Sequence, residues 1–363
     1  MTARQPEEIL RDIVQKQGRG AVVRRKMTLN KEANWLLALT LHTFAKVADG
    51  AKLTDLETTI AKAFRDNGFG DDDMRRHAEL ERAMPAQMRN EIFPRRFAQL
   101  DAKQGYSMKD LERDAAEIVR GVLARPNVTK VDVPAIHAGQ AHLGDFPLAP
   151  RATAREHGAA MLVATEPNAG VSDARYTIKA TSFRCVNRAT DSIFDPSNEP
   201  YWLFGSLGSG ISVTTRSQIF EGVDSGESRT FPANQGCIWG QNCAPQALPD
   251  GEVGALVSLF EHDEGDVTEV KAGFAAAFAA AAVILTASGV AAWVGAVVAG
   301  VGTMLQWLLT LMNDDHIADQ TFVFTRDVVA KQVPAVGATQ GMTRRFDDGD
   351  GVYDLNLLIT HVS

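Results

Sequence analysis

Hydrophobic residues in the first part of the chain recur with the spacing of amphipathic helices. Ile9 and Ile13, for example, lie four residues apart on one helical stripe. A second segment carries Thr54 followed three residues later by Glu57, the pattern of an N-terminal capping box. These patterns predict a helical domain of about five helices over residues 1–125.

Several residues mark where these helices should begin and end. Asn30 and Ser107 are placed as N-caps, and Gly50 is placed as a stop. Pro85 and Pro94 interrupt one amphipathic segment, so we expect this segment to be kinked or split.

Residues 126–172 have no clear periodicity and are rich in Pro, Ala, Gly and His. This composition predicts an extended connector. Its histidines, His137, His142 and His157, are too scattered for a metal motif and are expected to face solvent.

From about residue 173 the pattern changes to the alternation of β-strands. Turn residues separate six or more short strands, such as ARYTIKATSFRCV, ISVTTRSQIF and GVYDLNLLITHV. Residues 173–363 are therefore expected to form an antiparallel β-sandwich. The predicted fold class is α+β, an N-terminal helical domain followed by a sandwich with an inserted hydrophobic α-helical hairpin.

That hairpin is expected at residues 272–312, which carry no formal charge. Ser288 and Gly289 divide the stretch into segments of about 17 and 23 residues, or roughly 25 and 35 Å as helices. A bilayer core about 30 Å thick needs roughly 20 residues. Because both ends return to the same predicted sandwich, a single-pass anchor is excluded. The residues expected to enter a membrane are Phe274, Phe278, Trp293, Leu305, Trp307 and Leu308.

The polar side chains of this stretch are too few to form a solvated face along either helix. They are Thr286, Ser288, Thr303, Gln306 and Thr310. Both helices must therefore be covered on nearly all sides. Lipid could cover them, and so could a protein core or an oligomer interface, because Ala and Gly pack closely in both settings.

Acidic residues of the C-terminal half cluster in the segments between predicted strands. Ca²⁺ takes about six to eight oxygen ligands, which carboxylates on flexible loops can supply. Asp is also a common turn residue, so one such cluster by itself would mean little. Their repetition leads us to expect a site for Ca²⁺ or another hard cation. The proposed ligands are Asp191, Asp195, Glu199, Glu261, Asp263, Asp314 and Asp315.

Two of these segments resemble the calcium loops of C2 domains. DSIFDPSNEPYWLFG is similar to the first loop, with Glu199 before Pro-Tyr where Asp is usual. LVSLFEHDEGD is similar to the strand that enters the other main loop, and NDDHIADQTFVFT to its end, with Ala318 where Gly is usual. The resemblance implies a calcium- and lipid-binding β-sandwich. It also places the hydrophobic hairpin in the loop by which C2 domains commonly touch membranes.

Composition narrows the function further. The net charge of -8 and the shortness of the basic runs argue against nucleic-acid binding. The cysteines are Cys185, Cys237 and Cys243. Three buried thiols are the favoured interpretation, and a loop closed by Cys237 and Cys243 is the alternative in an oxidising compartment. The N-terminus has no apolar core, so no classical signal peptide is expected. The soluble form should be cytoplasmic, or released by a non-classical route, and conditionally membrane-associated.

Two functional hypotheses follow. The first is a membrane-active protein that binds Ca²⁺ through acidic loops and inserts the hairpin into lipid, with a pore-forming oligomeric toxin as its strongest form. The second is a structural or interaction protein whose hairpin is buried in the fold or in a homo-oligomer. Motifs for a catalytic serine, a zinc protease or a phosphate loop are missing, so we expect neither an enzyme nor an organic cofactor.

Overall fold

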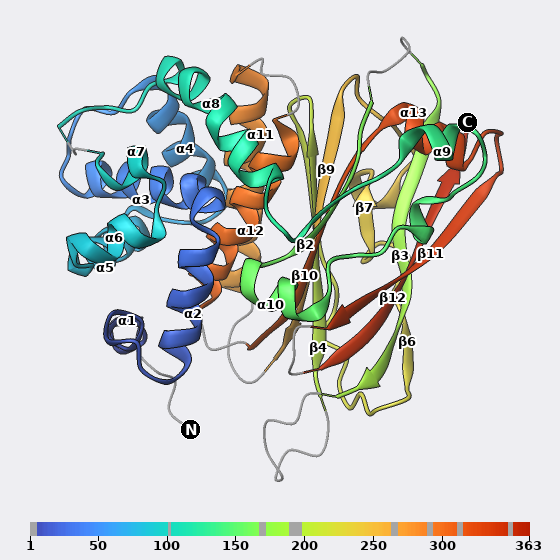
Figure 1. The fold of residues 1–363 in the computed structure, drawn as a ribbon, viewed down its shortest axis with the longest axis horizontal. Coiled ribbons are helices and arrows are strands. Elements are labelled where there is room, and N and C mark those ends of the chain that lie inside the picture. Colours follow the sequence, from blue (N-terminus) through green and yellow to red (C-terminus); the bar gives the residue numbers. More distant parts are fainter. Residues whose placement is uncertain are drawn as a thin grey trace. The chain divides into compact units, whose positions relative to one another are not determined.

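The computed structural model describes residues 6–100, 103–166, 172–188, 198–262, 268–288, 293–310, 315–347 and 351–363 (Figure 1). The chain forms two compact units. The helical unit comprises residues 1–125, 156–158 and 266–313. The two-sheet unit comprises residues 126–155, 159–265 and 314–363. The fold class is α+β with predominantly antiparallel sheets, as predicted.

The helical unit contains short and medium-length helices and one 3-10 turn. They are α1 (Pro6–Gln15), α2 (Gly18–Leu29), η1 (Lys31–Asn34), α3 (Trp35–Ala48), α4 (Asp55–Asp66), α5 (Asp71–Ala83), α6 (Ala86–Ile92), α7 (Arg95–Ala98), α8 (Met108–Leu123), α11 (Thr268–Ser288) and α12 (Val294–Thr310).

Several predicted helix boundaries are confirmed. The side chain of Thr54 accepts a hydrogen bond from the amide of Glu57, which completes the capping box at the start of α4. Ser107 caps α8 in the same way. Pro85 and Pro94 stand before α6 and α7 and so divide the predicted amphipathic segment into three helices.

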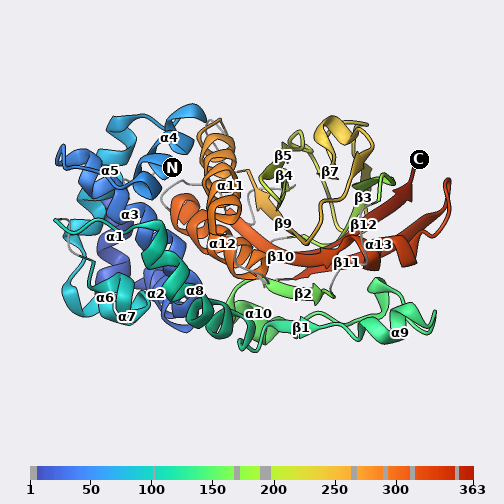
Figure 2. The same ribbon diagram turned by 90° about the horizontal axis from the view of Figure 1, so that it is seen from above.

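The long helix α3 lies at the centre of the helical unit. Every residue from Trp35 to Lys46 is buried, and α4, α5 and α12 pack against this helix. Figure 2 shows α11 and α12 side by side, next to α8 and α3. The hydrophobic hairpin is therefore part of the core of the helical unit.

This placement differs from the predicted domain division. The hairpin does interrupt the strand series, between β9 (Glu252–Glu261) and β10 (Asp315–Thr325). Its stretch of chain, residues 266–313, nevertheless belongs to the helical unit and not to the sheets. The reason is packing, since two helices without a polar face need apolar cover and the helical unit provides it.

The two-sheet unit contains two six-stranded sheets (Figure 1). Sheet A has the order β1 (Val128–Lys130), β2 (Ala160–Ala164), β10, β9, β4 (Pro200–Gly208) and β5 (Ile211–Arg216). Sheet B has the order β11 (Thr339–Asp347), β12 (Val352–His361), β3 (Arg175–Asn187) and β6 (Ser228–Thr230), with β7 (Cys237–Trp239) and β8 (Gln246–Ala247) also paired to β3.

The predicted extended connector contains regular structure. Strands β1 and β2 pair in parallel with each other, and β2 pairs in parallel with β10. The short elements α9 (Val133–His137), η2 (Leu143–Asp145) and α10 (Arg151–His157) also lie in this range. The strand β2 is the apolar run AMLVA, buried almost throughout. Such a run without alternation is typical of a parallel strand covered on both faces.

One hydrophobic core joins the two sheets. It combines inward residues of β4, β9 and β10 with those of β3, β11 and β12. Trp202 of β4 meets Phe346 of β11 edge to face, with ring centroids 4.9 Å apart. Buried residues occur at every second position along β12, as the alternation in the sequence predicted. Along β3 they do so on each side of a register shift that lies between Ala180 and Phe183.

Candidate functional site

The hairpin is the first candidate site. All six residues predicted to enter a membrane are buried in the structure. Within α11, the rings of Phe274 and Phe278 lie 5.0 Å apart. At the other side of the hairpin, the ring of Trp293 packs against Trp35 at a centroid distance of 5.1 Å. In this state, protein covers the residues that the sequence assigned to lipid.

Specific contacts hold α12 against the start of α3. The indole Nε1 of Trp35 donates a hydrogen bond of 3.2 Å to the carbonyl oxygen of Ala296. The hydroxyl of Thr303 donates one of 3.0 Å to the carbonyl oxygen of Ala33. A Cβ atom at Gly300 would lie only 2.9 Å from the Cβ of Leu36. The small residues noted in the sequence thus permit close helix packing here.

Helix α11 is covered less completely than α12. It contacts α4, α8 and α12, yet Val283 near its C-terminal end remains 37% exposed. None of the helices in the described part of the chain is both long enough and apolar enough to cross a membrane.

The acidic residues form the second candidate site. The ends of three neighbouring strands of sheet A coincide, because Pro200 pairs with Glu261 and Glu261 pairs with Asp315. We call these adjoining strand ends, with the residue before β4, the acidic edge (Glu199, Glu261 and Asp315).

Glu261 accepts a backbone hydrogen bond within this edge. The residue is 6% exposed, and its Oε1 accepts a hydrogen bond of 2.8 Å from the amide of Glu199. No group of three or more His, Cys, Asp or Glu side chains that could hold a metal occurs among the residues whose placement is described. The proposed ligands Asp191, Asp195, Asp263 and Asp314, and the side chain of Asp315, lie outside that description.

A buried ionic cluster in the helical unit was missed by the sequence analysis. Glu57 is fully buried, and its Oε2 accepts hydrogen bonds from Lys46 Nζ and the amide of Thr54, both at 2.7 Å. Its Oε1 accepts one of 2.8 Å from the amide of Tyr106 and faces His42 Nε2 at 3.2 Å. Burial alone would raise the pKa of Glu57, but these four partners outweigh it and lower the pKa to about 2.

The capping-box pattern in the sequence identified Glu57 as a helix-capping residue. That local pattern carries no information on the charged partners of Glu57. Lys46 and His42 lie on α3, one turn apart. They meet Glu57 only through the packing of α3 on α4. The cluster is closed to solvent, so we assign it a structural role in fixing these two helices.

The cysteine interpretation requires a correction. The sequence favoured three thiols, whereas Cys237 and Cys243 form a disulfide and only Cys185 is a free, buried thiol. A tight turn brings the pair together. Gly240 has φ of 94°, and a Cβ there would lie 2.0 Å from the carbonyl oxygen of Ala244, so no other residue fits this turn.

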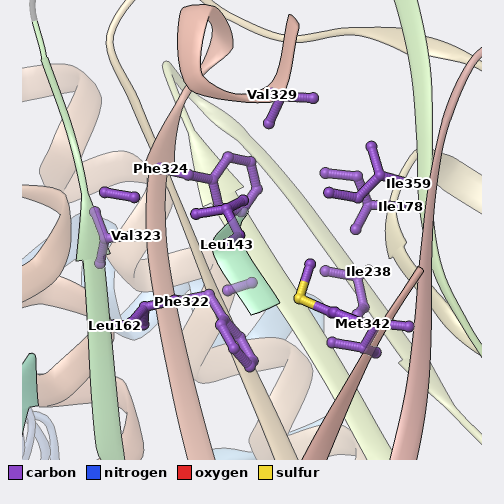
Figure 3. A pocket seen from close by; sticks show the side chains of 13 residues that line it. Leu143, Leu162, Ile178, Ile238, Phe322, Val323, Phe324, Val329, Met342 and Ile359 are labelled. Carbon is purple, nitrogen blue, oxygen red and sulfur yellow. The ribbon is translucent and has the colours of Figure 1, made fainter. Parts of the chain in front are cut away.

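A cavity lies between the two sheets of the two-sheet unit (Figure 3). Its volume is about 460 Å³ when the space open to solvent is included. Sheet A contributes residues of β2, β9 and β10, and sheet B contributes residues of β3, β7, β11 and β12. Leu143 of η2 and Val329 of α13 (Arg326–Gln332) complete the lining, and all the lining side chains are apolar.

Comparisons with known proteins add little. No protein-family model matches the chain, and no curated protein matches it. Among solved structures, human GIVD cytosolic phospholipase A2 is similar over 53% of this chain at 9% identity, with a TM-score of 0.22. Two structures of that protein with methyl gamma-linolenyl fluorophosphonate, one of them also with terbium chloride, give 7–8% identity over 52% of this chain and TM-scores of 0.22 and 0.23. The chain spans 17% of the length of these proteins, and the similarity is too low to support a fold or a function.

Proposed function

We propose that this is a membrane-active protein, not an enzyme, that exchanges burial of its hydrophobic hairpin in the helical unit for burial in lipid. The observation behind the proposal is where the hairpin leaves the sheet. It starts after Glu261 and returns before Asp315, and these two residues are direct partners on adjacent antiparallel strands. The hairpin could therefore change its surroundings while the register of sheet A stays intact.

The chemistry of the hairpin favours this exchange. Residues 272–312 contain no Asp, Glu, Lys or Arg. A single Asp, Lys or Arg at the centre of a membrane helix would cost about 2.5–3.5 kcal/mol. The helices that cover the hairpin, including α4 and α8, carry charged residues on their outer faces. Lipid could replace the apolar inner faces of these helices as the partner of the hairpin.

The length of the helices limits how the hairpin would enter. The 17 residues of α12 correspond to roughly 25 Å, which is shorter than a hydrocarbon core of about 30 Å. We therefore propose that the hairpin dips into the bilayer from one side, with both ends at the same surface. Pore formation would require several copies of the chain.

A divalent cation such as Ca²⁺ is part of the proposal. The strand ends at the acidic edge border three segments that the sequence predicts to carry ligands, and a C2-like β-sandwich is part of the same proposal. A cation bound there would neutralise carboxylates at the base of the hairpin and so reduce repulsion from anionic lipid.

A charge placed at an exposed position of the hairpin tests the proposal. Val283 is 37% exposed, so Val283→Lys should change the stability of the protein in solution by no more than about 0.5 kcal/mol. It should nevertheless reduce vesicle binding and dye release by about 100-fold, since a Lys deep in lipid costs about 2.5–3.5 kcal/mol. Val22→Lys is the matched control, because Val22 in α2 is 66% exposed and lies outside the hairpin.

The assay is flotation and dye release with vesicles of phosphatidylcholine and phosphatidylserine, in calcium and in chelator. A variant in which a short Gly-Ser turn replaces residues 266–313 provides the hairpin-free reference. Equal binding by the wild type, Val283→Lys and the hairpin-free variant would exclude the hairpin as the membrane element. Absence of any binding by the wild type would exclude membrane activity altogether.

The hydrogen bonds of Trp35 and Ala33 with α12 favour a second candidate, a structural or interaction protein with a permanently buried hairpin. These hydrogen bonds tie the hairpin to α3 through defined geometry, which lipid would not need. This function predicts no vesicle binding and a stable homo-oligomer or partner complex without lipid. Light scattering that shows a monodisperse monomer would count against the homo-oligomer.

A further inference from the structure

A cluster of phenylalanine rings joins three segments of the helical unit. Phe44 of α3 meets Phe64 of α4 edge to face, with ring centroids 4.9 Å apart, and both side chains are fully buried. Residues 67–70, which we call the corner, connect α4 to α5. Phe69 of the corner lies 5.4 Å from Phe64 and 5.9 Å from Phe44 between ring centroids. We call these three rings the phenylalanine box, and a charge placed among them would be poorly solvated.

The imidazole of His77, on α5, packs against the phenylalanine box. Its ring centroid lies 5.4 Å from that of Phe69 and 6.2 Å from that of Phe44. The residue is 6% exposed, and among the described residues its Nδ1 has no hydrogen-bond partner. This place suits the neutral imidazole, because an imidazolium would need acceptors for two N–H groups and compensation for its charge.

The charges around His77 do little to stabilise its protonated form. Burial lowers the pKa of His77 to about 4, Arg76 of the same helix lowers it further, and Asp73 opposes the fall. Several other charged side chains of α3, α4 and α5 bind one another instead, namely His42, Lys46 and Glu57 in the buried cluster, Asp49 with Arg82, and Arg65 with Asp71.

The corner that carries Phe69 also touches the hairpin. Helix α4 packs against α11 (Figure 2). Gly68, next to Phe69, has φ of 91°, and a Cβ there would lie 4.0 Å from the Cβ of Ala272 in α11. A movement of the corner away from α3 would therefore also remove cover from the start of α11.

The start of α4 has a separate attachment to α3. Glu57, in the first turn of α4, binds Lys46 and faces His42. Because the pKa of Glu57 is lowered to about 2, its carboxylate stays ionised at pH 4.5 and this attachment persists in mild acid. Phe64 lies about two turns further along the helix. The corner can therefore open while the start of α4 stays in place.

We propose that His77 is an acid-sensitive switch that controls how the helical unit covers its hairpin. When the imidazole takes up a proton, the imidazolium leaves the phenylalanine box for water. The corner then separates from α3, and the start of α11 loses its cover. The consequence for lipid, in which mild acid prepares the hairpin for insertion, rests on the membrane function proposed above.

Amide hydrogen exchange without lipid tests the switch by itself. Protection factors, corrected for the direct effect of pH on exchange, are compared at pH 7.5 and pH 4.5. For a pKa of 6.5 in the open state and about 4 in the closed state, opening becomes roughly 70-fold more favourable between these conditions. The end of α4, α5 and the start of α11 should lose protection by about this factor, whereas amides of α3 around Lys46 should change less.

Two variants assign the effect to this histidine. His77→Leu keeps an apolar group against the phenylalanine box and cannot take up a proton, so the protection of its α11 should change by less than about threefold between the two conditions. His142→Leu is the matched control, because His142 is exposed and lies in the two-sheet unit. It should lose protection in α11 as the wild type does. Circular dichroism at pH 7.5 checks that each variant is folded.

Vesicle flotation in chelator measures the consequence for lipid. The wild type should bind vesicles of phosphatidylcholine and phosphatidylserine at least about tenfold more tightly at pH 4.5 than at pH 7.5, and His77→Leu should lack this gain. Absence of binding in both conditions, together with the acid-dependent exchange of α11, would exclude the membrane function and support the switch. Equal binding in both conditions, with unchanged exchange of α11, would support the membrane function and exclude the switch.

Two results of the exchange experiment would overturn the switch. One is a wild-type protein whose α11 protection changes by less than about threefold between pH 7.5 and pH 4.5. The other is a folded His77→Leu protein whose α11 loses protection in acid as the wild type does. Should His77→Leu not fold, His77→Met provides the same comparison, because Met is also uncharged and adapts to irregular apolar sites.

Discussion

Neutralising Glu57 should destabilise the helical unit in a way that depends on pH. In Glu57→Gln the buried Lys46 loses its carboxylate, and two amides share one remaining oxygen acceptor. Breaking a buried ion pair on one side costs about 3–5 kcal/mol. Glu91→Gln provides the matched control, because Glu91 pairs with Arg24 at 2.7 Å but is partly exposed, and its loss should cost no more than about 1 kcal/mol.

The pKa of Glu57 gives an independent magnitude. The fall from 4.5 to about 2 in the folded state corresponds to about 3 kcal/mol, at about 1.4 kcal/mol per pKa unit. Because the folded pKa is the lower one, this stabilisation is complete above pH 4.5 and is lost as the pH falls toward 2. The stability difference between the wild type and Glu57→Gln should therefore be large at pH 7 and small near pH 2.

Urea unfolding, read by amide hydrogen exchange in α3 and α4, measures this difference, since those amides report on the helical unit alone. The double variant Lys46→Met/Glu57→Gln should lose less than the sum of the two single variants, by at least about 1 kcal/mol. A loss below about 1 kcal/mol in Glu57→Gln at pH 7, or a difference from wild type that does not shrink in acid, would refute the reasoning.

Three further predictions concern other buried groups. Burial, with the nearby Arg76, lowers the pKa of His77 to about 4. Up to about 3 kcal/mol of stability should therefore be lost as the pH falls from 6.5 to 4. In urea unfolding, His77→Leu should not show this loss. Gly300→Ala should lower the thermal midpoint by crowding Leu36, whereas Gly273→Ala meets only the mobile end of Leu308 and should not. The variant Cys237→Ser/Cys243→Ser should destabilise the two-sheet unit by about 2 kcal/mol, as expected for a short closed loop. Reductant should lower the thermal midpoint of the wild type by a similar amount. An unchanged stability in both experiments would argue against the disulfide.

Local signals in the sequence predicted local structure well. The capping box of Thr54 and Glu57 and the N-cap Ser107 need only neighbouring residues, and the structure has all of them. The alternation along β3 and β12 likewise reflects a period fixed by strand geometry.

Predictions that depended on partners far away in the chain were less complete. The parallel pairing of the run AMLVA with β10 could not be predicted from its sequence. A short apolar segment can belong equally to a connector, a helix or a strand. The cavity between the two sheets exists only where five or more segments meet. No spacing in the sequence encodes such a meeting.

The hairpin shows most clearly which features the sequence determines and which depend on the tertiary structure. The sequence by itself determined that residues 272–312 form paired helices that must be covered nearly all round, because they carry no charge and almost no polar face. It could not decide what covers them, since Ala and Gly surfaces pack equally well on lipid and on protein. Only the tertiary structure decided that, in this state, α3, α4 and α8 cover them, because these helices supply complementary apolar surface and, at Trp35, a hydrogen-bond donor to the carbonyl oxygen of Ala296.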